Sequence, residues 1–115
     1  MIPRKLGMCA LLIVTGASTA SAQVANGRYQ IGTCTTHPEE TVVRLENNVL
    51  TFYESVCTLA NPQPIDGTDG FSYVGNCAGE GQEWQANMLL IPLQDGQVMR
   101  MIRDGIVLDY QRCTP

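Results

Sequence analysis

The chain has 115 residues and carries eleven acidic against seven basic side chains, which gives a net charge of −4 at pH 7. This acidity argues against a protein that binds nucleic acid or an anionic membrane, because both ligands need a basic surface. The length fits a single domain.

Residues 1–22 have the form of a secretory signal peptide. Arg4 and Lys5 give the positive start, residues 6–14 are apolar, and Ala20-Ser21-Ala22 matches the small-residue cleavage pattern. The apolar run is far shorter than the ~20 residues that a membrane-spanning helix needs. We therefore expect cleavage before Gln23 and export to the periplasm or the extracellular space, with no membrane span left after cleavage.

The expected mature chain, residues 23–115, is a single secreted domain with five arginines, no lysine and eleven acidic residues, and so with a net charge of −6. An even number of cysteines in an exported chain predicts two disulfides. The intervals between these cysteines contain no Cys-x-x-Cys pair, which argues against a zinc site. We expect no metal and no cofactor. The disulfide cysteines are Cys34, Cys57, Cys77 and Cys113.

The first part of the domain predicts one strand followed by a hairpin. Residues 28–34 alternate in polarity, as a strand does, and residues 35–40 predict a loop that holds the only histidine, His37. Residues 41–57 predict a hairpin that turns at Asn47-Asn48, because asparagine tolerates a positive φ. This turn places Leu45 opposite Leu50.

Glu54 interrupts the apolar face of this hairpin. Three explanations stay open: a β-bulge shifts the register there, the strand leaves the core at that point, or the carboxylate is partly buried and has a role. On the third explanation Glu54 is a candidate binding residue.

Residues 58–70 form the longest stretch without a strand pattern. Their prolines and glycines predict a loop rather than the interior of a strand or helix. Asp66 and Asp69 are candidate binding residues there, although the stretch lacks the residue order of a calcium loop. A second glycine-rich loop is expected over residues 77–82.

Residues 71–113 predict four strands in series, over residues 71–78, 83–93, 97–103 and 106–113. Asp95-Gly96 and Asp104-Gly105 are signals of two-residue hairpins, and they fix the register of the last three strands. That register places Arg100 opposite Asp109, a favourable cross-strand pair. The whole pattern predicts an all-β fold: a small antiparallel meander of about seven strands that forms a barrel or a compact sandwich, stapled by two disulfides.

The direction of the strands limits the disulfide pairing. In a strict meander Cys34, Cys57 and Cys113 fall at one end of the sheet and Cys77 at the other, whereas a disulfide needs Cα atoms within ~7 Å. We expect the 58–70 loop to cross the sheet and relieve this conflict. The pairing favoured on this basis is Cys34 with Cys57 and Cys77 with Cys113.

Alternation along the strands divides the last part of the sheet into two faces. One face is expected to form the core and holds Trp84, Ala86, Met88, Leu90, Met99, Met101, Leu108 and Tyr110. If the other face is bare, it is an apolar contact surface. Alternatively the first hairpin covers it in a sandwich, or the sheet is reversed and buries the Arg100–Asp109 pair. Around that pair this face holds Leu89, Ile91, Val98, Ile102 and Val107.

Familiar catalytic groups are scarce in the mature chain. It has one histidine, no lysine and no Gly-x-Ser-x-Gly motif, and its cysteines are expected in disulfides. A carboxylate pair among Glu54, Glu80 and Glu83 is what remains for glycoside chemistry. We therefore expect that the protein is not an enzyme and has no catalytic residues.

The sequence favours a non-catalytic exported binding or inhibitor module that acts on another extracytoplasmic protein or associates with itself. One alternative is a small-ligand-binding β-barrel lined by Trp84, Phe52, Tyr110 and the methionines, although a barrel this small leaves little room inside. A second alternative is a small hydrolase that uses acidic residues. The candidate binding residues are Trp84, Glu54, Asp66, Asp69, Ile91, Ile102 and Val107.

Overall fold

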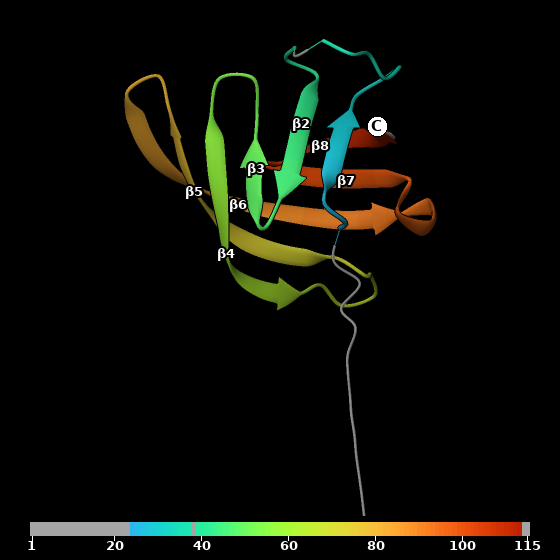
Figure 1. The fold of residues 1–115 in the computed structure, drawn as a ribbon. Coiled ribbons are helices and arrows are strands. Elements are labelled where there is room, and N and C mark those ends of the chain that lie inside the picture. Colours follow the sequence, from blue (N-terminus) through green and yellow to red (C-terminus); the bar gives the residue numbers. More distant parts are fainter. Residues whose placement is uncertain (1–23, 38, 114–115) are drawn as a thin grey trace, which may run out of the picture.

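The described part of the chain folds into an antiparallel β-barrel. The computed structural model describes residues 24–37 and 39–113, so the signal peptide expected over residues 1–22 lies outside them. Each strand pairs with the next, and β8 pairs with β1, which closes the sheet (Figure 1). The all-β prediction is confirmed, as a closed barrel of eight strands. These are β1 (Gly27–Gln30), β2 (Val42–Glu46), β3 (Val49–Thr51), β4 (Val56–Pro64), β5 (Phe71–Gly79), β6 (Gln82–Leu93), β7 (Val98–Arg103) and β8 (Ile106–Cys113).

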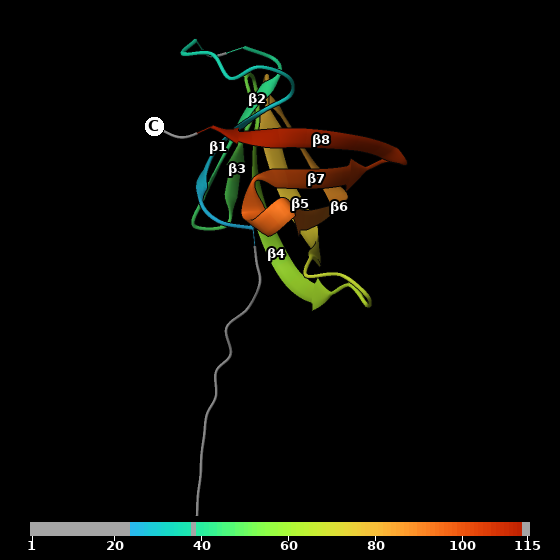
Figure 2. The same ribbon diagram turned by 90° about the vertical axis from the view of Figure 1, so that its right-hand side faces the viewer.

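The barrel has two groups of strands that cross each other. In Figure 1, β1–β3 run almost at right angles to β6–β8, and the long, curved β4 and β5 join the two groups. Figure 2 shows the β7–β8 hairpin reaching out from the body of the barrel. Because neighbouring strands reverse direction, the connections at residues 31–41, 52–55, 80–81 and 104–105 belong to the same end of the barrel, which we call the Trp84 end.

Two-residue turns set the register of the hairpins. At Asn47-Asn48 the φ angles are 52° and 68°, and at Asp104-Gly105 they are 53° and 76°, as a type I′ turn requires. The predicted pairs Leu45–Leu50 and Arg100–Asp109 are found in the ladders. Glu80-Gly81 makes a similar turn, so the loop predicted over residues 77–82 shrinks to two residues and β5 continues to Gly79.

The prediction of a loop over residues 58–70 is wrong for its first half. Residues 56–64 form β4, which pairs with β5 on either side of a β-bulge around Asn61 and Pro62. Asn61 has a φ of 54° in this bulge. Proline cannot donate a ladder hydrogen bond, but a bulge or a strand end does not need one. The loop is therefore confined to residues 65–70.

The second of the three explanations for Glu54 is correct. β3 ends at Thr51, and residues 52–55 make a turn in which the Phe52 amide donates to the Ser55 carbonyl over 2.8 Å. Glu54 is exposed in this turn, so its carboxylate is not buried. The predicted 41–57 hairpin is thus β2, β3 and the first residues of β4.

Side chains fill the interior of the barrel. The inward-facing side chains at its centre are only 0–1% exposed, as expected because the interior of an eight-stranded barrel is just wide enough for side chains to pack. The Tyr29 hydroxyl donates to the Ala25 carbonyl over 2.6 Å, and burial raises the pKa of Tyr29. The predicted core positions Met88, Leu90, Met99 and Met101 are confirmed, whereas Trp84, predicted for the same face, is 41% exposed. The most buried core residues are Tyr29, Val43, Leu50, Cys57, Met88, Met99 and Met101.

Two disulfides form, but the favoured pairing of Cys34 with Cys57 and Cys77 with Cys113 is wrong. The structure joins Cys34 to Cys113 and Cys57 to Cys77. Because β4 continues beyond Cys57, this residue lies directly opposite Cys77 on β5, with the Cα atoms 4.0 Å apart. The loop after β1 turns back toward β8, which lets Cys34 reach Cys113.

A buried amide shapes that loop. β1 ends at Gln30, earlier than the predicted strand over residues 28–34, and Gln30 is only 2% exposed. Its side-chain oxygen accepts from the Thr35 amide over 2.8 Å, and its side-chain nitrogen donates to Glu39 and Thr41 over 3.2 Å each. A buried polar group whose hydrogen bonds are all made fixes its surroundings.

No helix in the described part of the chain is long and apolar enough to cross a membrane.

Candidate functional site

Trp84 lies where the inner face of β6 passes beyond the packed core. It shares its side of the strand with Met88 and Leu90, which are buried, but Trp84 itself is 41% exposed. Its ladder partner is Cys77 of the Cys57–Cys77 disulfide, so the strand under it is cross-linked to its neighbour. The sequence placed Trp84 correctly on the inner face and did not show that it lies past the end of the core.

A groove with both apolar and polar lining residues opens beside Trp84 at the Trp84 end of the barrel. It has a volume of about 390 Å³. Ile106, near the tip of the projecting β7–β8 hairpin, is 59% exposed. The polar residues that line it are Ser55, Gln85, Arg103 and Asp104. We call this hollow the Trp84 groove; its apolar lining consists of Trp84, Ala86, Met101, Ile106 and Leu108.

A second hollow lies next to the Trp84 groove along β6. It has a volume of about 510 Å³, and Trp84 and Gln85 line both hollows. Val56 adds an exposed apolar side chain, and Glu83 a carboxylate. Val56 and Thr58 flank the buried Cys57, so this hollow lies on the outer face of the sheet.

The turn at residues 52–55 is held close to this site by its neighbours. The Arg103 guanidinium lies over the Phe52 ring at 5.1 Å, a cation–π contact. On the other side the turn packs against Gly79, where a Cβ atom would come within 2.6 Å of the Glu54 carbonyl oxygen and 2.8 Å of the Ser55 Cβ. Glycine at this position therefore lets the turn lie against β5.

The packing of this turn brings two carboxyl groups together. The side chains of Glu54 and Glu80 come within hydrogen-bonding reach of each other. This hydrogen bond, together with the charge of Glu80, raises the pKa of Glu54 above its usual value. Glu83 lines the second hollow, and Asp104 lines the Trp84 groove beside Arg103.

The candidate residues on the outer face of the barrel do not join this site. Ile102 and Val107 are ladder partners on the outside of the β7–β8 hairpin, where Val107 is 54% exposed. Ile91 is buried, since its side chain packs where the backbone of Gly70 passes. Asp66 and Asp69 lie exposed in the 65–70 loop at the opposite end of the barrel.

The Arg100–Asp109 pair settles the orientation of the sheet. Both side chains are exposed, and two hydrogen bonds of 2.8 and 2.9 Å join the guanidinium to the carboxylate. The hydrogen bond from Arg100 lowers the pKa of Asp109 below its usual range. The reversed sheet that buries this pair is therefore wrong, and so is the sandwich in which the first hairpin covers the face, because β2 and β3 are part of the barrel wall.

Residues 24–37 and 39–113 contain no group of three or more histidine, cysteine, aspartate or glutamate side chains that could hold a metal ion. His37 is exposed in the 31–41 loop, and its backbone carbonyl accepts a hydrogen bond from Arg28 over 3.1 Å.

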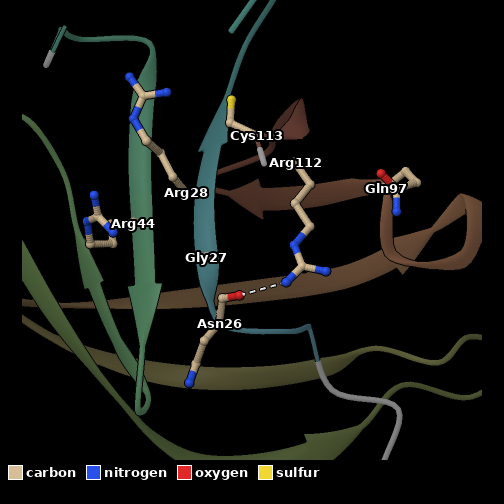
Figure 3. A pocket seen from close by; sticks show the side chains of 7 residues that line it. All are labelled: Asn26, Gly27, Arg28, Arg44, Gln97, Arg112 and Cys113. Atoms are coloured by element: carbon tan, nitrogen blue, oxygen red, sulfur yellow. Dashed lines mark hydrogen bonds between the residues drawn. The ribbon is translucent and has the colours of Figure 1, made fainter. Parts of the chain in front are cut away.

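One cluster was not anticipated from the sequence. Arg28, Arg44 and Arg112 line a cavity of about 420 Å³ beside β1, together with the polar side chains of Asn26 and Gln97 (Figure 3). Arg28 and Arg44 are direct ladder partners of β1 and β2. No tight turn joins these two strands, so turn chemistry gave no register for them.

Comparison with protein-family models, with curated proteins and with solved structures found no match for this chain. The function proposed below therefore depends on the geometry of its own side chains.

Proposed function

We propose that the protein is a non-catalytic exported module that binds another extracytoplasmic protein through the Trp84 groove. The observation that carries this proposal is a half-exposed tryptophan beside a groove, at the end of a barrel whose interior is already filled. Tryptophan side chains in such pockets are frequent centres of binding energy in protein interfaces.

The charges around the groove indicate the kind of partner. Glu83 and Asp104 line the two hollows together with the basic Arg103, Glu54 precedes Ser55 of the groove, and the expected mature chain carries a net charge of −6. An acidic rim attracts a basic partner surface and speeds its association. The partner that fits is an exported protein with an apolar side chain presented among lysines or arginines.

The two other functions considered from the sequence have less support. A ligand-binding barrel needs internal space, whereas Met88, Met99 and Tyr110 occupy the interior. A glycosidase of the retaining type holds its two carboxyl groups about 5–5.5 Å apart across a bound sugar. Glu54 and Glu80 instead lie within hydrogen-bonding reach of each other, and Glu54 is exposed.

The test is capture of a partner by the exported protein immobilised on a resin, followed by mass spectrometry and by titration with the purified partner. Trp84→Ala should weaken binding about thirtyfold, because the loss of a central aromatic residue costs about 2 kcal/mol. Ile106→Ser should weaken binding in the same direction. Val107→Ser is the matched control for Ile106→Ser, since Val107 is 54% exposed against 59% for Ile106 but lies on the outer face.

The proposal fails if the partner binds Trp84→Ala and the wild type with equal affinity while circular dichroism shows both to be folded. It also fails if the purified protein carries a small organic molecule bound inside the barrel, since the protein would then be a ligand-binding barrel. High salt should weaken binding of the partner by the wild type. A smaller loss of affinity in a Glu83→Gln variant would show that this carboxylate attracts the partner.

A further inference from the structure

Two arginines face each other across the ladder that joins β1 to β2. Arg28 and Arg44 are direct Cα partners. Like charges at directly opposite positions of a sheet destabilise it. The expected mature chain has eleven acidic residues against five arginines, so a carboxylate partner would be easy to supply within the chain.

In the described residues, neither Arg28 nor Arg44 forms an ion pair with a carboxylate. Within the part of the chain that the structure describes, the ion pair found is the one between Arg100 and Asp109, on another part of the barrel. Glu39 is the nearest candidate, because it lines a hollow of about 380 Å³ together with Arg28 and Arg44. Its carboxylate instead accepts hydrogen bonds from Thr41 over 2.8 Å and Gln30 over 3.2 Å.

The cavity on the other side of the arginine pair has the composition of an anion site. Its volume is about 420 Å³, and Arg112 adds a third guanidinium beside the side chains of Asn26 and Gln97. None of the residues that line it is acidic. Arginine guanidinium groups and side-chain amides are the donors that proteins use for phosphate, sulfate and carboxylate groups.

Backbone carbonyls fix two of the three guanidinium groups. Arg112 donates to the Asn26 carbonyl over 3.1 Å, the bond drawn in Figure 3, and Gly27 leaves room for it, since a Cβ there would lie 3.3 Å from Nε. Arg28 donates to the His37 carbonyl over 3.1 Å. In Figure 3 the Arg28 and Arg44 side chains stand on one side of β1 and Arg112 on the other. Arg28 and Arg44 are thus the pair that can hold one ligand, and Arg112 adds charge at its edge.

We propose that Arg28 and Arg44 bind a small oxyanion, a phosphate, sulfate or carboxylate group, on the outer face of β1 and β2. A ligand with one or two negative charges would relieve the repulsion between the two guanidinium groups. A long polyanion fits less well, because the net charge of −6 repels it. This site is separate from the Trp84 groove and does not depend on the function proposed for it.

The proposal is tested by thermal unfolding and titration calorimetry of the exported protein with sodium phosphate, sodium sulfate and sodium glucuronate, each against sodium chloride at the same ionic strength. At least one oxyanion should raise the melting temperature relative to chloride. Arg44→Gln should weaken binding of that oxyanion about tenfold or more, because a charge-assisted pair of hydrogen bonds is lost. Arg44→Lys should keep part of the affinity. Arg100→Gln, which removes an arginine paired with Asp109, should leave binding unchanged.

A second readout separates a binding role of Arg44 from a structural one. In chloride alone, Arg44→Gln should melt at or above the temperature of the wild type, because the substitution removes repulsion from Arg28. The proposal is overturned if none of the three oxyanions differs from chloride. It is equally overturned if Arg44→Gln binds them as the wild type does, or if it melts lower in chloride, since Arg44 would then stabilise the fold by itself.

Discussion

Of the two disulfides, Cys34–Cys113 should stabilise the fold more, because it restricts the entropy of the unfolded chain more. The bridge joins residues 79 positions apart. A closed loop of that length removes about 15 cal/mol/K from the unfolded chain, or about 4.5 kcal/mol at 25 °C. The Cys57–Cys77 bridge spans 20 positions and gives about 3.3 kcal/mol on the same relation. Cys34 is exposed, so the double variant Cys34→Ala with Cys113→Ala loses little packing at that end.

The assay is equilibrium unfolding in urea at 25 °C. A domain of about 90 residues has a total stability of about 5–14 kcal/mol, so the double variant should unfold at a much lower urea concentration. Its m-value should also rise, because an unfolded chain without the bridge exposes more surface. A loss below about 2 kcal/mol with an unchanged m-value would refute the reasoning, since it would show that the bridge does not restrain the unfolded chain.

Three further outcomes are expected. Leu50→Ala should lower the free energy of unfolding in urea by about 2–5 kcal/mol, because the side chain is fully buried and leaves a cavity; a loss below 1 kcal/mol would mean that the core closes around the gap. Gly70→Ala should cost about 1–3 kcal/mol in the same assay, since its Cβ would lie 2.5 Å from the Leu90 carbonyl oxygen; wild-type stability would contradict this contact. For Glu54, whose pKa is raised from its usual 4.5, the proton shared with Glu80 stabilises the fold at low pH, and this contribution is lost as the pH rises through the raised value. Glu54→Gln should therefore melt higher than the wild type at pH 7, with a difference that shrinks toward pH 4; a difference independent of pH would exclude the carboxyl pair as its cause.

Turn chemistry explains why the last three strands were predicted in detail. Asp95-Gly96 and Asp104-Gly105 each fix a register within a few residues, and alternation then assigns every side chain to a face. The cross-strand pair of Arg100 and Asp109 follows from these local signals and is confirmed. The assignment of Trp84 to the inner face has the same origin.

The errors concern features that depend on distant parts of the chain. Proline and glycine in residues 58–70 indicate a loop by local rules, whereas β5 offers β4 a partner along its whole length and a bulge absorbs Pro62. The continuation of β4 then decides the disulfide pairing. The long connection over residues 31–41 gives β1 and β2 no register from a tight turn, so the juxtaposition of Arg28 with Arg44 had no local signal.

The seam between β8, β1 and β2 connects the stability of the barrel to the proposed oxyanion site. β1 has four ladder pairs with β2 and three with β8, against nine between β5 and β6. The β2–β3 and β3–β4 ladders are as short, with three pairs each, and cross-links gather around β1: the Cys34–Cys113 disulfide and the hydrogen bonds of Gln30. The like charges of Arg28 and Arg44 oppose the pairing of β1 with β2, and the hydrogen bond from Arg28 to the His37 carbonyl does not neutralise them. An oxyanion bound between them would turn that repulsion into attraction and add a further tie across the same two strands.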